Sequence, residues 1–205
     1  MRKMLLLAAA CSTLALVGTA GATKPAAVTI SLSRATIVYG GSVKLSGAVS
    51  NHKSGESVKV LARAYGESAF SELATVNTAS GHWTYTASPT IRTRYEAQWG
   101  NALSRVVVVR VRPKIELSLD SRTTRRGTFT VGVHGQRSFQ GKWVLVQRLT
   151  SNGPIPLKHV KLGAGSAATF TIRLPKRRAR VRVVMPTSQT APGYIAGYSN
   201  VWSSS

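Results

Sequence analysis

The amino-acid sequence predicts an all-β protein made of two antiparallel β-sandwiches in tandem. Short segments of alternating apolar and polar residues recur along the chain, and this period of two is typical of a strand that buries one face. Turn signals separate the segments every ~8–12 residues and no helical period runs through them, which indicates a sandwich. A run of β-branched residues near the middle, after which the pattern of the first half returns, indicates two domains.

The central run covers residues 104–113 and reads Ser-Arg-Val-Val-Val-Val-Arg-Val-Arg-Pro. Valine is restricted at its first side-chain torsion and packs well on a pleated surface, so we expect a strand here. Pro113 has no amide hydrogen and pushes Arg112 into an extended conformation, so regular pairing should stop at this point. We therefore expect one domain over residues 26–112 and another over residues 113–203. Because no glycine–serine tract joins them, we expect a short, stiff connection and an elongated shape.

Alternation predicts the strands of the first domain. They cover residues 28–33, 36–39, 42–50, 58–64, 71–78, 82–86, 93–99 and 104–113. Glycine marks two of the turns between them, at Gly40-Gly41 and at Ser80-Gly81. Trp83 and Tyr85 follow the second turn on one face of a strand, so we expect Trp83 to lie in the core.

The second half repeats this plan at an offset of about 86 residues, far above the ~20–50-residue period of solenoids, which indicates a duplicated domain. Its expected strands cover residues 114–120, 127–135, 142–149, 155–162, 168–174, 180–185 and 194–202. In the strand over residues 142–149, either Trp143 and Leu145 or Val144 and Val146 face inward. We favour Trp143, because sandwiches often bury a tryptophan at this strand.

Four motifs of the first half carry a resemblance to a known family. They are Tyr39-Gly40-Gly41-Ser42-Val43, Ser57-Val58-Lys59-Val60, Gly81-His82-Trp83-Thr84-Tyr85 and Thr93-Arg94-Tyr95. This region, roughly residues 26–112, resembles the bacterial immunoglobulin-like domains of secreted and cell-surface proteins. The resemblance implies a seven-stranded sandwich that serves as a spacer, adhesion or binding module, and it implies no shared catalytic residues.

Residues 1–22 have the form of a secretory signal peptide. Arg2 and Lys3 make a charged start, residues 5–17 an apolar core, and Ala20-Gly21-Ala22 fits the cleavage rule. A transmembrane anchor is disfavoured because the apolar stretch is shorter than the ~20 residues needed to span a bilayer. A lipoprotein signal cut before Cys11 is a second alternative. Cleavage after Ala22 would remove the only cysteine, so we expect a secreted mature chain without disulfides and without a membrane span.

The charge of the chain is strongly unbalanced, with 28 Lys and Arg against 6 Asp and Glu and a net charge of +22. Residues 24–112 carry +7 and residues 113–205 carry +13. A field of this size attracts polyanions. The candidate polyanion-binding residues are Arg173, Lys176, Arg177, Arg178, Arg180 and Arg182.

Two interpretations of this basic run are open. Arg180 and Arg182 alternate with Val181 and Val183, so both arginines should point outward from one strand, with Arg173 adding to a basic stripe. Guanidinium forks bind phosphate or carboxylate oxygens, which favours a polymer site. The alternative is a solvated face that resists edge pairing. Aromatic residues do not interleave with the run, so specific binding of nucleic acid is not expected.

The sequence does not predict a catalytic, metal or cofactor site. Its four histidines and six acidic residues form none of the spacings that bind metals or activate a serine. Residues 163–166, Gly-Ala-Gly-Ser, are similar to a phosphate loop, but no helix follows them, so a plain turn is expected. Trp99 and Trp202 lie near strand ends, where stacking on sugars is an alternative to packing.

The leading hypothesis is a non-catalytic exported protein that acts as a spacer or adhesion module at the cell surface or in the cell wall. Its partner would be a cell-envelope polymer or another surface protein. The alternative is a soluble polyanion-binding protein acting through its basic second domain. An anionic polysaccharide, a teichoic-acid-like polymer or extracellular nucleic acid would then be the ligand. The oligomeric state is open at this point.

Overall fold

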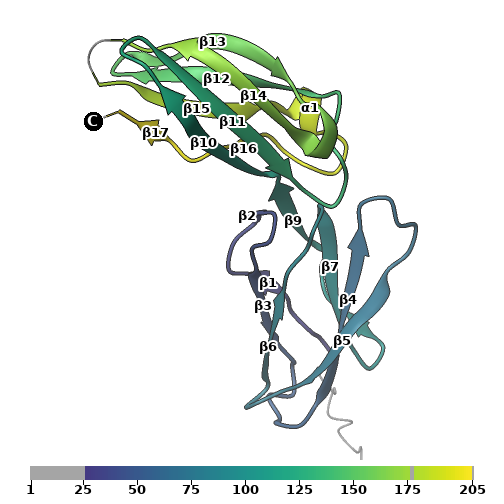
Figure 1. The fold of residues 1–205 in the computed structure, drawn as a ribbon. Coiled ribbons are helices and arrows are strands. Elements are labelled where there is room, and N and C mark those ends of the chain that lie inside the picture. The colour runs from purple at the N-terminus through teal and green to yellow at the C-terminus, as the bar shows by residue number, and fades with distance from the viewer. Residues whose placement is uncertain (1–25, 176–177, 205) are drawn as a thin grey trace, which may run out of the picture.

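The computed structural model describes residues 26–175 and 178–204. The expected signal peptide at residues 1–22 lies outside them, as do Lys176 and Arg177. The described chain is nearly all β, as predicted, and folds into two antiparallel sandwiches that meet end to end (Figure 1). Every extended strand ladder is formed within one sandwich, because the side chains that alternate along each half bury their apolar face against the same half.

The first sandwich consists of a three-stranded and a six-stranded sheet. Its strands are β1 (Ser31–Leu32), β2 (Thr36–Val38), β3 (Val43–Ala48), β4 (Ser57–Ala64), β5 (Ser71–Asn77), β6 (His82–Ala87), β7 (Thr93–Trp99), β8 (Ala102–Leu103) and β9 (Val107–Arg112). One sheet has the order β1-β3-β6, and the other has the order β2-β9-β7-β4-β5 with β8 on β7. All strand pairs of the sandwich are antiparallel except β2 with β9.

Trp83 lies in the core of the first sandwich, as predicted, with 1% of its surface exposed. Its indole sits against a strand position that only glycine can fill. A Cβ atom on Gly47 would lie 1.8 Å from the Thr29 carbonyl oxygen and 2.7 Å from Trp83 Nε1. The absence of a side chain on Gly47 therefore lets β3 pass close to residue 29 and to the tryptophan.

The second sandwich has a three-stranded and a five-stranded sheet. Its elements are β10 (Lys114–Arg122), β11 (Arg126–His134), β12 (Trp143–Thr150), β13 (Gly153–Lys161), η1 (Ala164–Ser166), β14 (Ala167–Arg173), β15 (Arg180–Met185), α1 (Thr187–Thr190), β16 (Gly197–Tyr198) and β17 (Trp202–Ser203). One sheet has the order β10-β11-β14, and the other has the order β13-β12-β15-β16 with β17 on β15. The glycine-rich segment around Gly163 forms η1, a turn between β13 and β14, as expected.

The predicted orientation of β12 is wrong. Val144 and Val146 are fully buried, whereas Trp143 is half-buried on the outer face and its ring meets His159 edge-on at 4.7 Å. Other aromatic rings fill this core: Phe129 and Phe170 of the other sheet stack with ring centroids 5.8 Å apart, Trp202 of β17 meets Phe129 edge-on, and Phe139 is buried in the loop before β12. Because these rings fill the space between the sheets, β12 contributes small β-branched side chains to the core.

The central run is shorter as a strand than the sequence predicts. The strand β9 begins at Val107, because Ser104 is buried and bonds locally: its Oγ accepts the Ala97 N–H at 2.9 Å and donates to the Arg105 carbonyl. Pairing stops at Arg112 as predicted, and β10 begins at Lys114, so Pro113 alone joins the sandwiches.

Candidate functional site at the junction of the two sandwiches

Tyr194 connects the two sandwiches through one hydroxyl group. The residue follows α1 and is 3% exposed. Its hydroxyl donates to the Thr90 carbonyl of the first sandwich at 2.7 Å and accepts the Gln136 N–H of the second at 2.7 Å. Burial raises the pKa of Tyr194, which keeps the phenol protonated and able to donate at neutral pH.

Backbone hydrogen bonds extend this connection on both sides of Tyr194. The Arg92 N–H donates to the Gly193 carbonyl at 3.0 Å, and the Ile195 N–H donates to the Val111 carbonyl at 3.1 Å. Gly193 adopts φ +89°, and a Cβ atom there would lie 2.6 Å from Ile91 Cδ1. Glycine is therefore required at this point, both for the left-handed backbone and for the close approach of the first sandwich.

Arg112 adds a side-chain contact at the same junction. Its Nη1 donates to the Ala196 carbonyl, and its guanidinium lies 5.3 Å from the centre of the Tyr198 ring. Arg182 lies over the same ring at 5.2 Å. The Tyr198 side chain thus links a cation of the first sandwich with one of the second.

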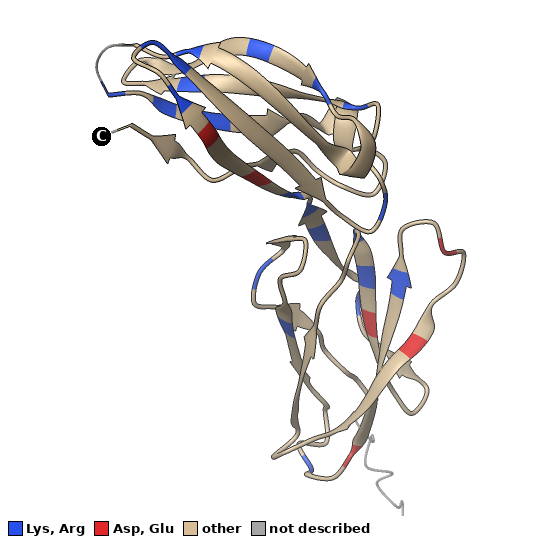
Figure 2. Cartoon of the chain, viewed as in Figure 1, with Lys and Arg blue, Asp and Glu red and all other residues tan. Residues whose placement is uncertain are grey.

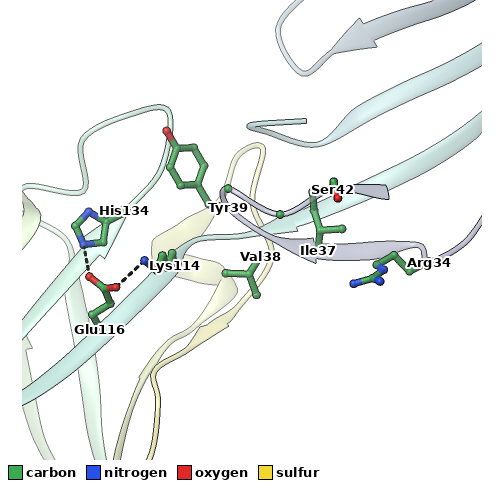
Figure 3. A pocket seen from close by; sticks show the side chains of 10 residues that line it. Arg34, Ile37, Val38, Tyr39, Ser42, Lys114, Glu116 and His134 are labelled. Atoms are coloured by element: carbon green, nitrogen blue, oxygen red, sulfur yellow. Dashed lines mark ion pairs between the residues drawn. The ribbon is translucent and has the colours of Figure 1, made fainter. Parts of the chain in front are cut away.

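One side of the junction is a hollow of about 650 Å³. The turn after β2, around Tyr39, faces Lys114, Glu116 and His134 across it (Figure 3). Glu116 pairs with Lys114 Nζ at 2.6 Å and with His134 Nε2 at 3.1 Å. The hydrogen bond and the charge of Lys114, with a smaller contribution from His134, lower the pKa of Glu116, so it stays a carboxylate and is a poor proton donor. Lys114, Glu116 and His134 therefore form an exposed network of ion pairs at the edge of the junction.

The predicted polyanion-binding residues do not all share one face. Val181 and Val183 are buried, so Arg180 and Arg182 point outward from β15, as predicted. Arg173 lies at the end of β14, which belongs to the other sheet, and is not part of their stripe. Arg182 is half-buried, and its Nε donates to Gln147 Oε1 at 3.0 Å. Arg178 is exposed just before β15.

Two arginines that the sequence analysis did not single out lie beside Arg173. Arg126 is its direct partner in the pairing of β11 with β14, and Arg125 precedes it. A hollow of about 410 Å³ is lined by these three residues with Leu174 and Pro175. No carboxylate lies within 4.0 Å of these arginines in the part of the chain that the structure describes. We call Arg125, Arg126 and Arg173 the distal cluster, and only the β11–β14 register identifies it.

The two tryptophans considered for sugar stacking are engaged in the fold. Trp99 Nε1 donates to Glu56 Oε2 at 2.9 Å, and this bond is the main cause of the lowered pKa of Glu56. Trp202 meets Phe129 edge-on with ring centroids 5.1 Å apart. Both side chains are half-buried, which favours packing over sugar stacking.

Neither a metal-type cluster nor a membrane-type helix occurs within residues 26–175 and 178–204. No three histidine, cysteine or acidic side chains come together there as metal ligands would. No helix in the same residues has the length and apolar character needed to cross a bilayer.

The chain was compared with known proteins. No protein-family model matches it, and no curated protein matches it. Among solved structures, it is similar to the "crystal structure of tetra-tandem repeat in extending region of large adhesion protein", with 13% sequence identity and a TM-score of 0.36. The similarity covers 87% of this chain and 49% of that one, so the chain spans about half the length of the adhesion-protein structure.

Proposed function

We propose that this chain is a non-catalytic, exported structural module of two immunoglobulin-like sandwiches that acts as a spacer or adhesion element. The observation that supports the proposal is the junction, where a single proline and hydrogen bonds on both sides of Tyr194 join the two sandwiches. A spacer needs a fixed distance between its ends, and short, bonded connections keep that distance.

The place of action we propose is outside the cell, at its surface or in its wall. The signal-like residues 1–22 support export. A net charge of +22 supports attraction to acidic polymers of a cell envelope, and another surface protein is the alternative partner.

The proposal includes no reaction, metal or cofactor. The closest group of ionisable side chains at the junction is Lys114 with Glu116 and His134, and it is exposed. The lowered pKa of Glu116 favours its charged form, whereas a general acid at neutral pH needs a raised one.

Paired spin labels test whether the spacer has a fixed length. Without residues 1–22 the chain has no cysteine, so Asn101→Cys and Asn152→Cys place one label on an exposed turn of each sandwich. We expect a narrow distribution of distances. Tyr194→Phe, which removes both hydroxyl bonds, should broaden it, while Tyr198→Phe should leave it narrow because no hydrogen bond to that hydroxyl occurs in the described residues. A broad distribution in the unmodified chain would reject the rigid spacer.

A second candidate function is polyanion binding through the second sandwich. The distal cluster supports it, because three guanidinium groups border one hollow without a neighbouring carboxylate. Replacing Lys176, Arg177, Arg178, Arg180 and Arg182 by glutamine should flatten the salt dependence of binding to an anionic polymer. Replacing the distal cluster in the same way should reduce affinity further. Unchanged affinity in both variants would leave these residues as a solvated face.

A further inference from the structure

We propose that a second basic surface, which we call the junction groove, binds an acidic polysaccharide across the two sandwiches. It consists of Arg63, Arg92, Arg94 and Arg110 of the first sandwich around Tyr65, together with the segment 187–195 of the second. Figure 2 shows basic residues on β4, β7 and β9 near the junction. This site does not depend on the proposed spacer function, since a rigid junction needs none of these guanidinium groups.

Strand register gathers the arginines on one face of the sheet. Arg63 on β4 is directly opposite Arg94 on β7, and Arg94 is opposite Val108 on β9. Arg110 follows Val108 by two residues and therefore points to the same side. Like charges directly opposite one another destabilise a sheet, so this arrangement has a cost that a bound anion would remove.

The acidic residues near the groove do not neutralise it. Within the described residues, no carboxylate lies within 4.0 Å of Arg63, Arg92, Arg94 or Arg110. Glu67 lines the same hollow as one carboxylate beside Arg63, Arg92 and Arg94, and its Oε2 accepts the Ala64 N–H at 3.1 Å, so the hollow keeps an excess of positive charge. Arg63 Nη1 donates to the Ser68 carbonyl at 3.3 Å, whereas no hydrogen bond within the described residues occupies the guanidinium groups of Arg92, Arg94 and Arg110, which are available to an external anion.

Two hollows make the groove continuous. One, of about 270 Å³, is bordered by Arg63 and Arg94, and the other, of about 370 Å³, by Arg110 and residues of the second sandwich. Tyr65 and Arg92 line both. The Arg92 N–H donates to Gly193, so the bond that holds the sandwiches together also places the two hollows side by side. The site is complete only when both sandwiches are present.

The lining of the groove indicates the chemistry of the ligand. Guanidinium forks match the oxygens of carboxylate and sulfate groups. Pro192 and Ile195 supply apolar surface in the second hollow, which suits the CH face of a sugar ring. An acidic polysaccharide presents an acidic group and the CH face of a sugar ring in every repeat.

The aromatic rings of this surface favour a sugar polymer over nucleic acid. Arg92 lies over the Tyr65 ring at 4.8 Å, and Arg63 lies over the Phe70 ring at 4.9 Å. Single-stranded nucleic acid is held by bases stacked on open aromatic rings, whereas one face of each of these rings is occupied by an arginine of the protein, with Tyr65 40% exposed.

Binding of two acidic polysaccharides to the mature chain tests the proposal. Isothermal titration with a sulfated glycan and with a polyuronate, at low and at high salt, shows which acidic group the groove accepts. The double variant Arg63→Gln with Arg94→Gln should lose about tenfold or more in affinity for whichever glycan binds, and its salt dependence should be shallower. Arg94→Lys keeps the charge without the fork and should give an intermediate loss.

Matched controls separate this site from general charge. Lys44→Gln with Lys53→Gln removes the same charge from exposed positions outside the groove and should change affinity less than twofold. Variants of the distal cluster should reduce the affinity for these two glycans less than the groove double variant does. Equal losses in the groove and control variants would overturn the proposal, as would the binding of neither glycan at low salt.

Two further measurements complete the test. Single-stranded DNA or polyphosphate that competes for the groove as well as the glycan would overturn the assignment of ligand class. Spin-label distances in the Arg63→Gln, Arg94→Gln variant should stay narrow, so loss of glycan binding is distinguishable from loss of the rigid junction. If the double variant unfolds, Arg110→Gln at the exposed end of the groove provides the same affinity measurement, and unchanged affinity there would count against the site.

Discussion

The two sandwiches share one plan but close their last strand differently. In the first, β9 is a continuous strand held by main-chain bonds to β7 and, in parallel, to β2. In the second, the corresponding segment is split into β16 and β17, with two residues each, and in the described residues its main-chain pairing with β10 is limited to the bridge between Ile115 and Ser199.

Side chains replace main-chain pairing where the second sandwich is split. Asn200 accepts the Leu117 N–H at 2.8 Å and donates to the Leu117 carbonyl at 2.9 Å. Ser199 Oγ accepts the Val183 N–H, and Ser204 Oγ accepts the Ala179 N–H. Each satisfies a backbone group that a continuous strand would have paired.

The difference follows from the junction. The segment 186–196 leaves the second sandwich to bring Gly193 and Tyr194 against the first, so it is not available as a strand. The shared strand order is therefore closed by main-chain pairing in the first sandwich, whereas the last connection of the second sandwich contacts the first. Substitutions in each should affect the two sandwiches separately.

The largest expected loss of folding stability comes from the core of the first sandwich, whose last strand is closed by main-chain pairing. Trp83→Ala should reduce the free energy of unfolding of the first sandwich by ~3–5 kcal/mol, because a fully buried aromatic side chain leaves a cavity. Denaturant unfolding, followed by a probe in each sandwich, should show the second transition unchanged. Trp83→Phe should cost less, since the indole nitrogen has no hydrogen-bond partner to lose. A loss below about 1 kcal/mol for the alanine variant would contradict the core assignment.

The second-largest expected effect is a loss of folding stability of the first sandwich at alkaline pH. Burial raises the pKa of Tyr95 to about 12, whereas an unfolded tyrosine titrates near 10. Because the folded pKa is the higher one, the stabilisation is fully present below about pH 10 and is lost as the pH rises toward 12. Absorbance titration of the phenolate together with unfolding at each pH measures this, and Tyr95→Phe should remove the dependence. Ionisation of Tyr95 near pH 10 would disprove it.

In the second sandwich, removing a side chain that hydrogen-bonds the last segment to β10 should reduce the free energy of unfolding less than truncating a core residue does. Asn200→Ala leaves the N–H and carbonyl of Leu117 without their partner and should destabilise this sandwich by about 1–2 kcal/mol. Asn152→Ala, on an exposed turn, is the control and should be nearly neutral. An equal effect of the two substitutions would mean that Asn200 does not close the strand.

The smallest effect should come from Trp143. Since its ring lies on the outer face against His159, Trp143→Ala should cost only about 1 kcal/mol or less. Val144→Ala removes less volume but from a fully buried position, so it should cost at least as much. Thermal unfolding of both variants compares them directly, and a Trp143→Ala loss as large as that of Trp83→Ala would restore the inward orientation.

Local pattern predicted most of the fold because alternation reports which face of a strand is buried. The strands around Trp83, Tyr95 and Val181 follow it closely. Both faces of the strand at Trp143 offer apolar residues, so alternation alone could not orient it, and the deciding rings lie on the facing sheet.

The candidate sites were harder to predict, since they depend on register between segments that are far apart in the chain. Arg63 and Arg94 become neighbours only through the β4–β7 pairing, and Arg126 and Arg173 only through β11–β14. Nothing local to the segment around Gly193 and Tyr194 distinguishes an arm that contacts another domain from an ordinary loop.

The parallel pair of β2 and β9 has a mechanical consequence. Tension that pulls the two ends of the first sandwich apart acts on β2 and β9 in opposite directions along their length. The bonds between them, such as Tyr39 N–H to Arg112 carbonyl and Arg110 N–H to Ala35 carbonyl, are then sheared together and cannot open one after another. Within the described residues, the second sandwich has at the same place one main-chain bridge, between Ile115 and Ser199, and the two side-chain bonds of Asn200 to Leu117. Under a stretching force the second sandwich should therefore yield first, while the first keeps its length.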